Sequence, residues 1–357
     1  MMMKKLTLIL LLWLPALSLF SAAPSAYYDV AEGQTSDNLR YALKSIIDGH
    51  RDVGYAGLYD VYKTSDNTAS GKVWDMYSTC TWTHGQKKCG SYSSVCDCYN
   101  REHSVPQSWF GKASPMVSDA FHVYPTDGRV NGQRGNLQFG ECANGTVLPG
   151  GKALGKAGQS TFPGYTSLTV FEPHDDYKGD FARTYFYMAT RYADICGSWG
   201  AAFNAVASNS GLSKYSIALF LKWHRADPVS QKEITRNDAV YAKQHNRNPF
   251  IDYPMLAEFI WGTQKGQPWY KTSTPIDQVE MQWLSVSPNP AVDYLLVSAD
   301  GVDQMSYQLL DLSGKMLQSG SVNSGEQISV TNLSNGIYLL KMDADAKSTV
   351  QKVIVNR

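Results

Sequence analysis

The distribution of cysteine and histidine divides this chain into two parts of different kind. All six cysteines and all seven histidines lie before residue 263, whereas residues 283–357 contain neither and alternate apolar with polar side chains. The stretch between the two parts is rich in Gly, Pro, Ser, Thr and Lys, as linkers are. We therefore expect one domain over residues 26–265, a linker over 266–282 and a second domain over 283–357.

The N-terminus predicts export. Lys4 and Lys5 precede an apolar run over residues 6–20, and small residues follow that run. This order is typical of a secretory signal peptide, which we assign to residues 1–25 and exclude from the fold. The competing interpretation is a membrane anchor, but the run is short for a spanning helix. No other segment approaches that length, so we expect no integral membrane span in the mature protein.

The cysteines favour disulfide bonds. An even number of cysteines in an exported chain is typical of disulfide pairing, although six cysteines allow 15 pairings and the sequence alone does not choose among them. The alternative is a zinc site, because four of the cysteines lie close together, but paired C-x-x-C knuckles are absent. The six are Cys80, Cys89, Cys96, Cys98, Cys142 and Cys196.

The patterning predicts an α+β protein with a mainly helical first domain and a small all-β second domain. Helical spacing and capping signals, including the S-x-x-E box of Ser230 and Glu233, predict helices over 179–196, 217–226, 230–244 and 254–261. Alternation and turn signals predict strands over 293–298, 306–311, 327–331, 336–342 and 349–355. About five short strands in this length indicate a β-sandwich.

Two blocks of the first domain carry the candidate chemistry. The first, NREHSVPQSWFG over 100–111, sets Glu102 beside His103 on an expected strand that ends at Pro106. Adjacent strand residues point to opposite faces, so the two can act together only where the strand edge or a bulge lets them converge. The second block, DAFHVYPTDGRVNGQRGNLQFG over 119–140, places Arg134 and Asn136 in or after a helical turn.

These blocks resemble the bacterial endonuclease I family of periplasmic and secreted non-specific nucleases. The order E-H, V-P, S-W-F-G, H-V-Y-P and V-N-G-x-R-x-N is similar to that family's ββα-metal (His-Me finger) active site. Segments over 178–192, 221–228 and 246–254 also look like the family, so the resemblance covers most of the first domain. It implies a metal-dependent endonuclease that cleaves DNA, RNA or both and leaves 5′-phosphates.

The resemblance also implies roles for individual residues. His103 matches the general base, while Glu102 and Asn136 match the two protein ligands of one metal ion. Arg134 is expected to help hold a phosphate. The family's transition-state arginine has Arg129, Arg134 and Arg183 as candidates. Gly135 departs from the Ser that family members often have at this position, without loss of a ligand.

The chemistry suits these residue types. A divalent cation can neutralise an anionic phosphodiester, and two oxygen ligands leave an open coordination sphere of the kind that Mg²⁺ prefers. We therefore expect Mg²⁺, with Mn²⁺ or Ca²⁺ as alternatives. A neutral histidine with an ordinary pKa near 6.5 can accept a proton at neutral pH.

The second domain resembles a type IX secretion sorting domain, a small β-sandwich found at the C-terminus of exported cargo. The resemblance rests on SVSPNPAVDYLLV, LLDLSGKMLQSG, LSNGIYLLKM and the closing VQKVIVNR. It implies passage through the periplasm, the type IX machinery as a partner, and a protein secreted or held at the cell surface. An ordinary adhesion or carbohydrate-binding sandwich is the alternative.

Other function classes remain as competing hypotheses. Lysine plus arginine equals aspartate plus glutamate, so the net charge is zero and any basic groove must be local. A catalytically decayed surface protein that binds nucleic acid or glycan is the principal alternative, although Glu102, His103 and Asn136 are all present. A metallopeptidase is disfavoured because H-E-x-x-H is absent. We expect the protein to act as a monomer.

Overall fold

The computed structural model describes residues 23–203, 210–271, 284–299, 302–311, 315–344 and 347–356. They belong to two compact units, Met1–Ser273 and Thr274–Arg357, each with a hydrophobic core of its own. The predicted signal peptide falls outside the described residues up to position 22, as does the predicted linker from position 272. Among the helices that the structure describes, none is long and apolar enough to cross a membrane.

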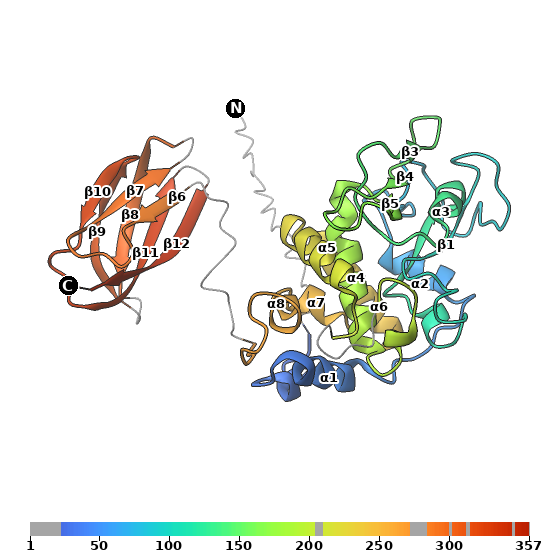
Figure 1. The fold of residues 1–357 in the computed structure, drawn as a ribbon, viewed down its shortest axis with the longest axis horizontal. Helices are drawn as coiled ribbons and strands as arrows, with labels where there is room; N and C mark the ends of the chain where they lie inside the picture. The colour runs from blue at the N-terminus through green and yellow to red at the C-terminus, as the bar shows by residue number, and fades with distance from the viewer. Residues whose placement is uncertain are drawn as a thin grey trace, which may run out of the picture. The chain divides into compact units, whose positions relative to one another are not determined.

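The first unit mixes helices with short antiparallel strands (Figure 1). Its longer helices are α1 (Ser36–Ile47), α2 (Leu58–Ser65), α3 (Gly128–Arg134), α4 (Lys178–Arg191), α5 (Lys214–Ala226) and α6 (Gln231–Gln244). Two short ones, α7 (Pro249–Asp252) and α8 (Leu256–Ile260), follow. The strands are β1 (Tyr99–His103) paired with β2 (Val123–Asp127), and β3 (Thr146–Val147), β4 (Lys156–Gln159) and β5 (Thr169–Glu172) in a second sheet.

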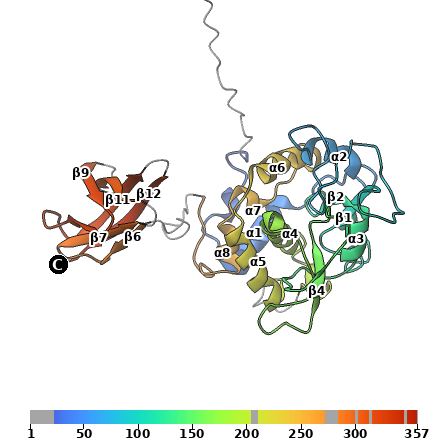
Figure 2. The same ribbon diagram turned by 90° about the horizontal axis from the view of Figure 1, so that it is seen from above.

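Helix α4 is the centre of this unit. Every residue of α4 after the first is buried, and α1, α5 and α7 pack against it. Figure 2 shows α4 nearly end-on with these helices around it. A wholly buried helix must satisfy its polar side chains internally, and Tyr185 does so by donating from its hydroxyl to the Ser104 carbonyl at 2.8 Å. The core thereby supports the chain just beyond β1.

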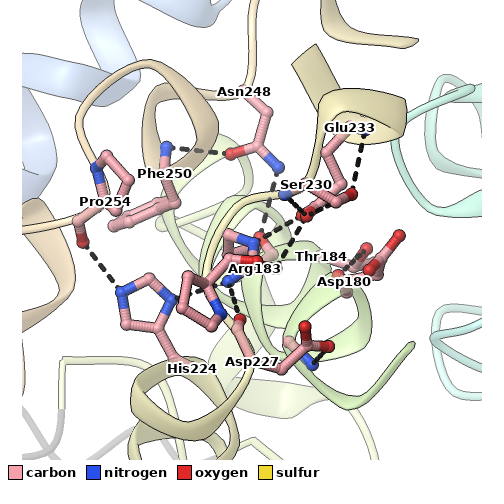
Figure 3. Close-up of polar contacts among 12 residues, drawn as sticks. Asp180, Arg183, Thr184, His224, Asp227, Ser230, Glu233, Asn248, Phe250 and Pro254 are labelled. Atoms are coloured by element: carbon pink, nitrogen blue, oxygen red, sulfur yellow. Dashed lines mark hydrogen bonds and ion pairs between the residues drawn. The ribbon is translucent and has the colours of Figure 1, made fainter. Parts of the chain in front are cut away.

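A buried polar network joins α4, α5 and α6 (Figure 3). The Arg183 guanidinium forms a fork with both carboxylate oxygens of Glu233, with Nη2 donating to Oε2 at 2.7 Å. Glu233 also completes the capping box with Ser230 that the sequence predicted for α6. His224 donates from one ring nitrogen to the Pro254 carbonyl at 3.0 Å, and its other nitrogen faces Arg183.

The second unit has two antiparallel sheets. One sheet has the order β10–β7–β6, and the other has the order β12–β11–β8–β9. The strands are β6 (Leu284–Ser287), β7 (Tyr294–Ala299), β8 (Gln304–Leu310), β9 (Met316–Asn323), β10 (Glu326–Ser329), β11 (Gly336–Ala344) and β12 (Lys347–Val355). Alternate residues of β11 are buried, as the alternation of apolar and polar residues in its sequence predicts. The strand-rich C-terminal region is confirmed, and β6 and β9 are additions to it.

Two disulfides close the segment that precedes β1. The structure describes all six cysteines and joins Cys80 to Cys96 and Cys89 to Cys98. Cys142 and Cys196 are buried and unpaired. The preference for disulfides over a zinc site is thus confirmed for four of the six cysteines.

Candidate functional site

A pocket of about 360 Å³ lies at the C-terminal end of β1, between that strand and α3. Glu102, His103, Arg134 and Asn136 all line it, so the structure brings the four predicted site residues together. β1 and α3 lie side by side in Figure 1 and are in contact. Glu102 and His103 point to opposite faces of β1, yet both line the pocket because it lies where the strand ends.

Asp127 sets the start of α3 and ties it to the disulfide segment. Its Oδ1 accepts from the backbone N–H groups of Arg129 and Val130, as an N-cap side chain does, and its Oδ2 accepts from the Cys96 N–H at 2.7 Å. Cys80, Cys96 and Asp127 thus lie close together in the manner of a metal cluster. The two sulfurs share a disulfide bond, however, so they offer no thiolate to a metal.

Glu102 is held from one side only. Its Oε1 accepts from the Tyr77 hydroxyl at 2.8 Å and from Arg134 Nη1 at 2.6 Å. Oε2 receives no hydrogen bond from any residue that the structure describes. Burial raises the pKa of this carboxyl, while the positive charge of Arg134 and the Tyr77 hydrogen bond lower it. Burial has the larger effect, so the pKa of Glu102 stays above its ordinary value, while the ion pair with Arg134 favours the charged form. One oxygen is left for another ligand.

His103 is arranged as a proton acceptor. Its Nε2 lies 3.0 Å from the Val117 carbonyl, which can only accept, so Nε2 carries the proton and Nδ1 carries the lone pair. Burial, helped by the neighbouring His122, lowers the pKa of His103 to about 3. The imidazole is therefore neutral at neutral pH.

Arg134 lines the pocket and is bonded to the protein around it. It is 1% exposed and donates to Glu102, to the backbone carbonyls of His103 and Ser104, and to that of Leu137. These bonds differ from the phosphate contact expected from the sequence, because they commit the guanidinium to the protein itself. In this structure Arg134 orients Glu102 and fastens the end of β1 to α3.

Asn136 follows the last turn of α3 and is exposed. Gly135, at φ 54° and ψ −123°, turns the chain between Arg134 and Asn136. A side chain at that position would be strained, which accounts for glycine there in physical terms. None of the described residues bonds to the Asn136 amide, so its oxygen is free for a ligand.

The remaining candidates from the sequence lie elsewhere. Arg129 is outside the pocket, and Arg183 is fully buried in the network of Figure 3. The expectation that either contacts a phosphate in this pocket therefore has no support in the geometry. His122, interpreted as structural, is fully buried and donates to the Met116 carbonyl at 2.6 Å.

Tyr55 and Arg101 are among the other residues that line the pocket, and neither was expected there from the sequence. Arg101 could have been found by strand periodicity, because it lies two residues before His103 and shares its face of β1. Tyr55 comes from the loop between α1 and α2, and no local signal connects it to β1.

Comparison with known proteins gives two family matches. Residues 35–255 match the family described as endonuclease I, and residues 285–356 match the secretion system C-terminal sorting domain. An extracellular ribonuclease of Bacillus subtilis (strain 168) is 35% identical over 250 residues, which cover 67% of this chain and 81% of that protein. One from Bacillus amyloliquefaciens is 36% identical over 248 residues, 68% of this chain and 80% of that protein. An extracellular deoxyribonuclease of Aeromonas hydrophila is 26% identical over 173 residues, 48% of this chain and 57% of that protein.

Proposed function

Since the chain belongs to the endonuclease I family, we propose that it is a metal-dependent endonuclease that hydrolyses phosphodiester bonds of DNA, RNA or both. It acts with little sequence specificity and leaves 5′-phosphates. The C-terminal sorting domain assigns the enzyme to the cell surface or the medium. We assign its export to the type IX machinery and the N-terminal segment to a signal peptide.

One observation carries the proposal. A neutral histidine and a buried carboxylate share one pocket with an exposed amide. Among the described residues, none bonds to the Nδ1 of that histidine or to the second oxygen of that carboxylate. Strand β1, strand β2 and helix α3 then form the ββα-metal motif. The antiparallel register sets Glu102 opposite Tyr124 and His103 opposite Val123.

The donor set fits a hard divalent cation. Glu102 Oε2 and the Asn136 amide oxygen are the oxygen ligands that Mg²⁺ prefers, with Mn²⁺ or Ca²⁺ as alternatives. When bound, such an ion neutralises charge on the phosphate and on the departing 3′ oxygen. Arg134 and Tyr77 orient the carboxylate through its Oε1.

His103 performs the proton transfer. Its Nδ1 takes a proton from the attacking water while Nε2 remains bonded to the Val117 carbonyl. The water oxygen forms a bond to phosphorus, the bond from phosphorus to the 3′ oxygen breaks, and solvent protonates that oxygen. The phosphate therefore stays on the 5′ end of the downstream fragment.

Replacement of the base tests the proposal. The mature His103→Ala protein should cleave plasmid DNA and RNA at least ~100-fold more slowly than wild type, the lower range for loss of a general base. Chelator should stop the wild-type enzyme, and end-group analysis should find 5′-phosphates. Full activity of His103→Ala would refute this mechanism. Binding of nucleic acid without shortening by the wild type would favour a decayed binding protein instead.

A further inference from the structure

Tyr55 packs against the face of β1 that carries Arg101 and His103. Arg101 and His103 lie two residues apart on that strand, so their side chains share one face. The guanidinium carbon of Arg101 is 3.5 Å from the centroid of the Tyr55 ring. The His103 ring is stacked near the same tyrosine, with 5.8 Å between centroids and 26° between planes. One aromatic side chain therefore contacts both the expected base and a cation beside it.

The loop that carries Tyr55 is held in place. Asp52 Oδ1 accepts from the Gly54 N–H at 2.8 Å and from the Ser118 hydroxyl at 2.5 Å. Arg101 Nη1 donates to the backbone carbonyl of Tyr55 at 2.7 Å. Gly54 has φ 69°, a conformation that glycine adopts without strain. These contacts fix the tyrosine before any substrate arrives.

The fixed tyrosine is nevertheless accessible. Tyr55 is 39% exposed and lines the pocket, unlike the aromatic side chains that fill the core of this unit. Arg101 Nε is buried and has no hydrogen-bond partner among the residues that the structure describes. Glu102 and Arg134 neutralise each other, so Arg101 supplies the remaining positive charge among the residues lining this pocket.

We propose that Tyr55 and Arg101 form a nucleotide subsite next to the scissile phosphate. Tyr55 stacks on one unpaired base, and Arg101 contacts a phosphate of the same strand. This assignment rests on the proposed nuclease function and adds a substrate class, which is single-stranded or locally unpaired nucleic acid. In a duplex both faces of a base are covered by its neighbours, so the ring reaches a base only after unstacking.

The test for Tyr55 uses a short single-stranded DNA whose linkages are phosphorothioates except for one ordinary phosphodiester. Versions with an abasic sugar on either side of that linkage remove one base at a time. For the wild type, the abasic sugar at the stacked position should raise KM roughly 10- to 100-fold, as loss of one aromatic–base stack does. Tyr55→Ala should have the raised KM already on the intact substrate, and the abasic sugar should not raise its KM further.

Tyr55→Phe is the matched control, because it keeps the ring and should behave as wild type. Thermal unfolding checks that Tyr55→Ala folds, and its loss of kcat/KM should be larger on single-stranded DNA than on duplex DNA, where the base is already covered. Equal losses on single strand and duplex, or an undiminished abasic effect in Tyr55→Ala, would overturn the subsite and leave the nuclease proposal standing.

Arg101 is tested by binding, which needs no cleavage. Fluorescence anisotropy with labelled single-stranded DNA in the presence of chelator, which prevents cleavage, should give a plot of log Kd against log salt concentration. In Arg101→Ala the slope should fall by about 0.7, the value for one phosphate contact on a single strand. Arg101→Lys should keep most of the slope.

Lys88→Ala is the control for charge alone, because Lys88 and Arg101 each lie 4.7 Å from the Tyr59 ring, and Lys88 does not line the pocket. Its slope should match the wild type. An unchanged slope in Arg101→Ala, or equal changes in both variants, would refute the phosphate contact. A wild type that binds single strands yet cleaves neither single strand nor duplex would contradict the nuclease function but not the subsite.

Discussion

The Glu102–Arg134 ion pair should contribute both to the stability of the fold and to catalysis. Both side chains are almost wholly buried, and the charge of Arg134 lowers the pKa of a carboxyl that burial raises. Loss of one member of a buried pair costs about 3–5 kcal/mol because the other charge is left without a partner. In Arg134→Met the pKa of Glu102 should rise further, so the carboxyl is protonated nearer neutral pH. We expect a lower Tm and a large loss of Mg²⁺-dependent cleavage at pH 7, partly recovered at higher pH.

The control for that variant is Arg129→Met, an arginine on the same helix but outside the pocket. It should keep the wild-type pH profile and Mg²⁺ requirement. For both variants, thermal unfolding measures the Tm, and titration with Mg²⁺ measures the metal dependence of cleavage. If Arg134→Met retained the wild-type Mg²⁺ response, Arg134 would not be positioning the ligand.

At the scale of elements, the end of α3 is set by Gly135. Its φ of 54° with ψ −123° is a conformation essentially confined to glycine, and such strain costs on the order of 1–3 kcal/mol in another residue. Gly135→Ala should therefore destabilise the protein and move Asn136, weakening metal affinity. Gly71→Ala is the matched control, because Gly71 has φ 70°, open space around its Cα and no place in the pocket. Gly71→Ala should lose stability but keep its Mg²⁺ affinity, measured by titration of cleavage; equal affinities in both variants would refute the role of this turn.

The network of α4, α5 and α6 should make the protein sensitive to acid. Burial, and then the charge of Arg183, lowers the pKa of His224 from 6.5 to about 4. The unfolded chain therefore binds the proton first as the pH falls, and stability present above pH 6.5 is lost towards pH 4. A shift of this size corresponds to about 3 kcal/mol. His103 and His122 are shifted in the same direction and add to the effect.

Urea unfolding at pH 7 and pH 4.5 measures that loss. Glutamine at position 224 can still donate to the Pro254 carbonyl and accept from Arg183, yet it does not titrate. His224→Gln should thus lose less stability than wild type between the two pH values. Equal losses would mean that His224 is not the group that couples the network to pH.

The helices and strands differ in how well the sequence predicts them. Capping residues and periodicity act locally, so the helix opened by Ser230 and Glu233 was predictable to its last residue, Gln244. Strand β9 was missed because it is an edge strand with mostly exposed side chains, and its sequence therefore lacks alternation. The site residues of the two motif blocks were predictable, but their partners were not. Tyr55 reaches His103 only through tertiary packing, and the commitment of Arg134 to backbone carbonyls depends on where β1 ends.

At the scale of the whole molecule, the two units should have separate functions. Each has its own buried core, and of the residues that the structure describes, none that lines the pocket comes after Asn136. Residues 283–357 contain five basic and seven acidic side chains, a balance that does not attract phosphate. Catalysis should therefore belong to the first unit and export to the second.

A mature chain that ends at residue 273 tests this division. Because its core and pocket are complete, it should fold and cleave DNA and RNA with kcat/KM within about twofold of the full chain. Its dependence on salt should also be unchanged, since the removed unit contributes no phosphate contacts. Residues 274–357 alone should fold, as followed by circular dichroism and thermal unfolding, and should not shift labelled nucleic acid in a gel. A truncated enzyme with normal Tm but a much higher KM would instead mean that the C-terminal unit takes part in substrate binding.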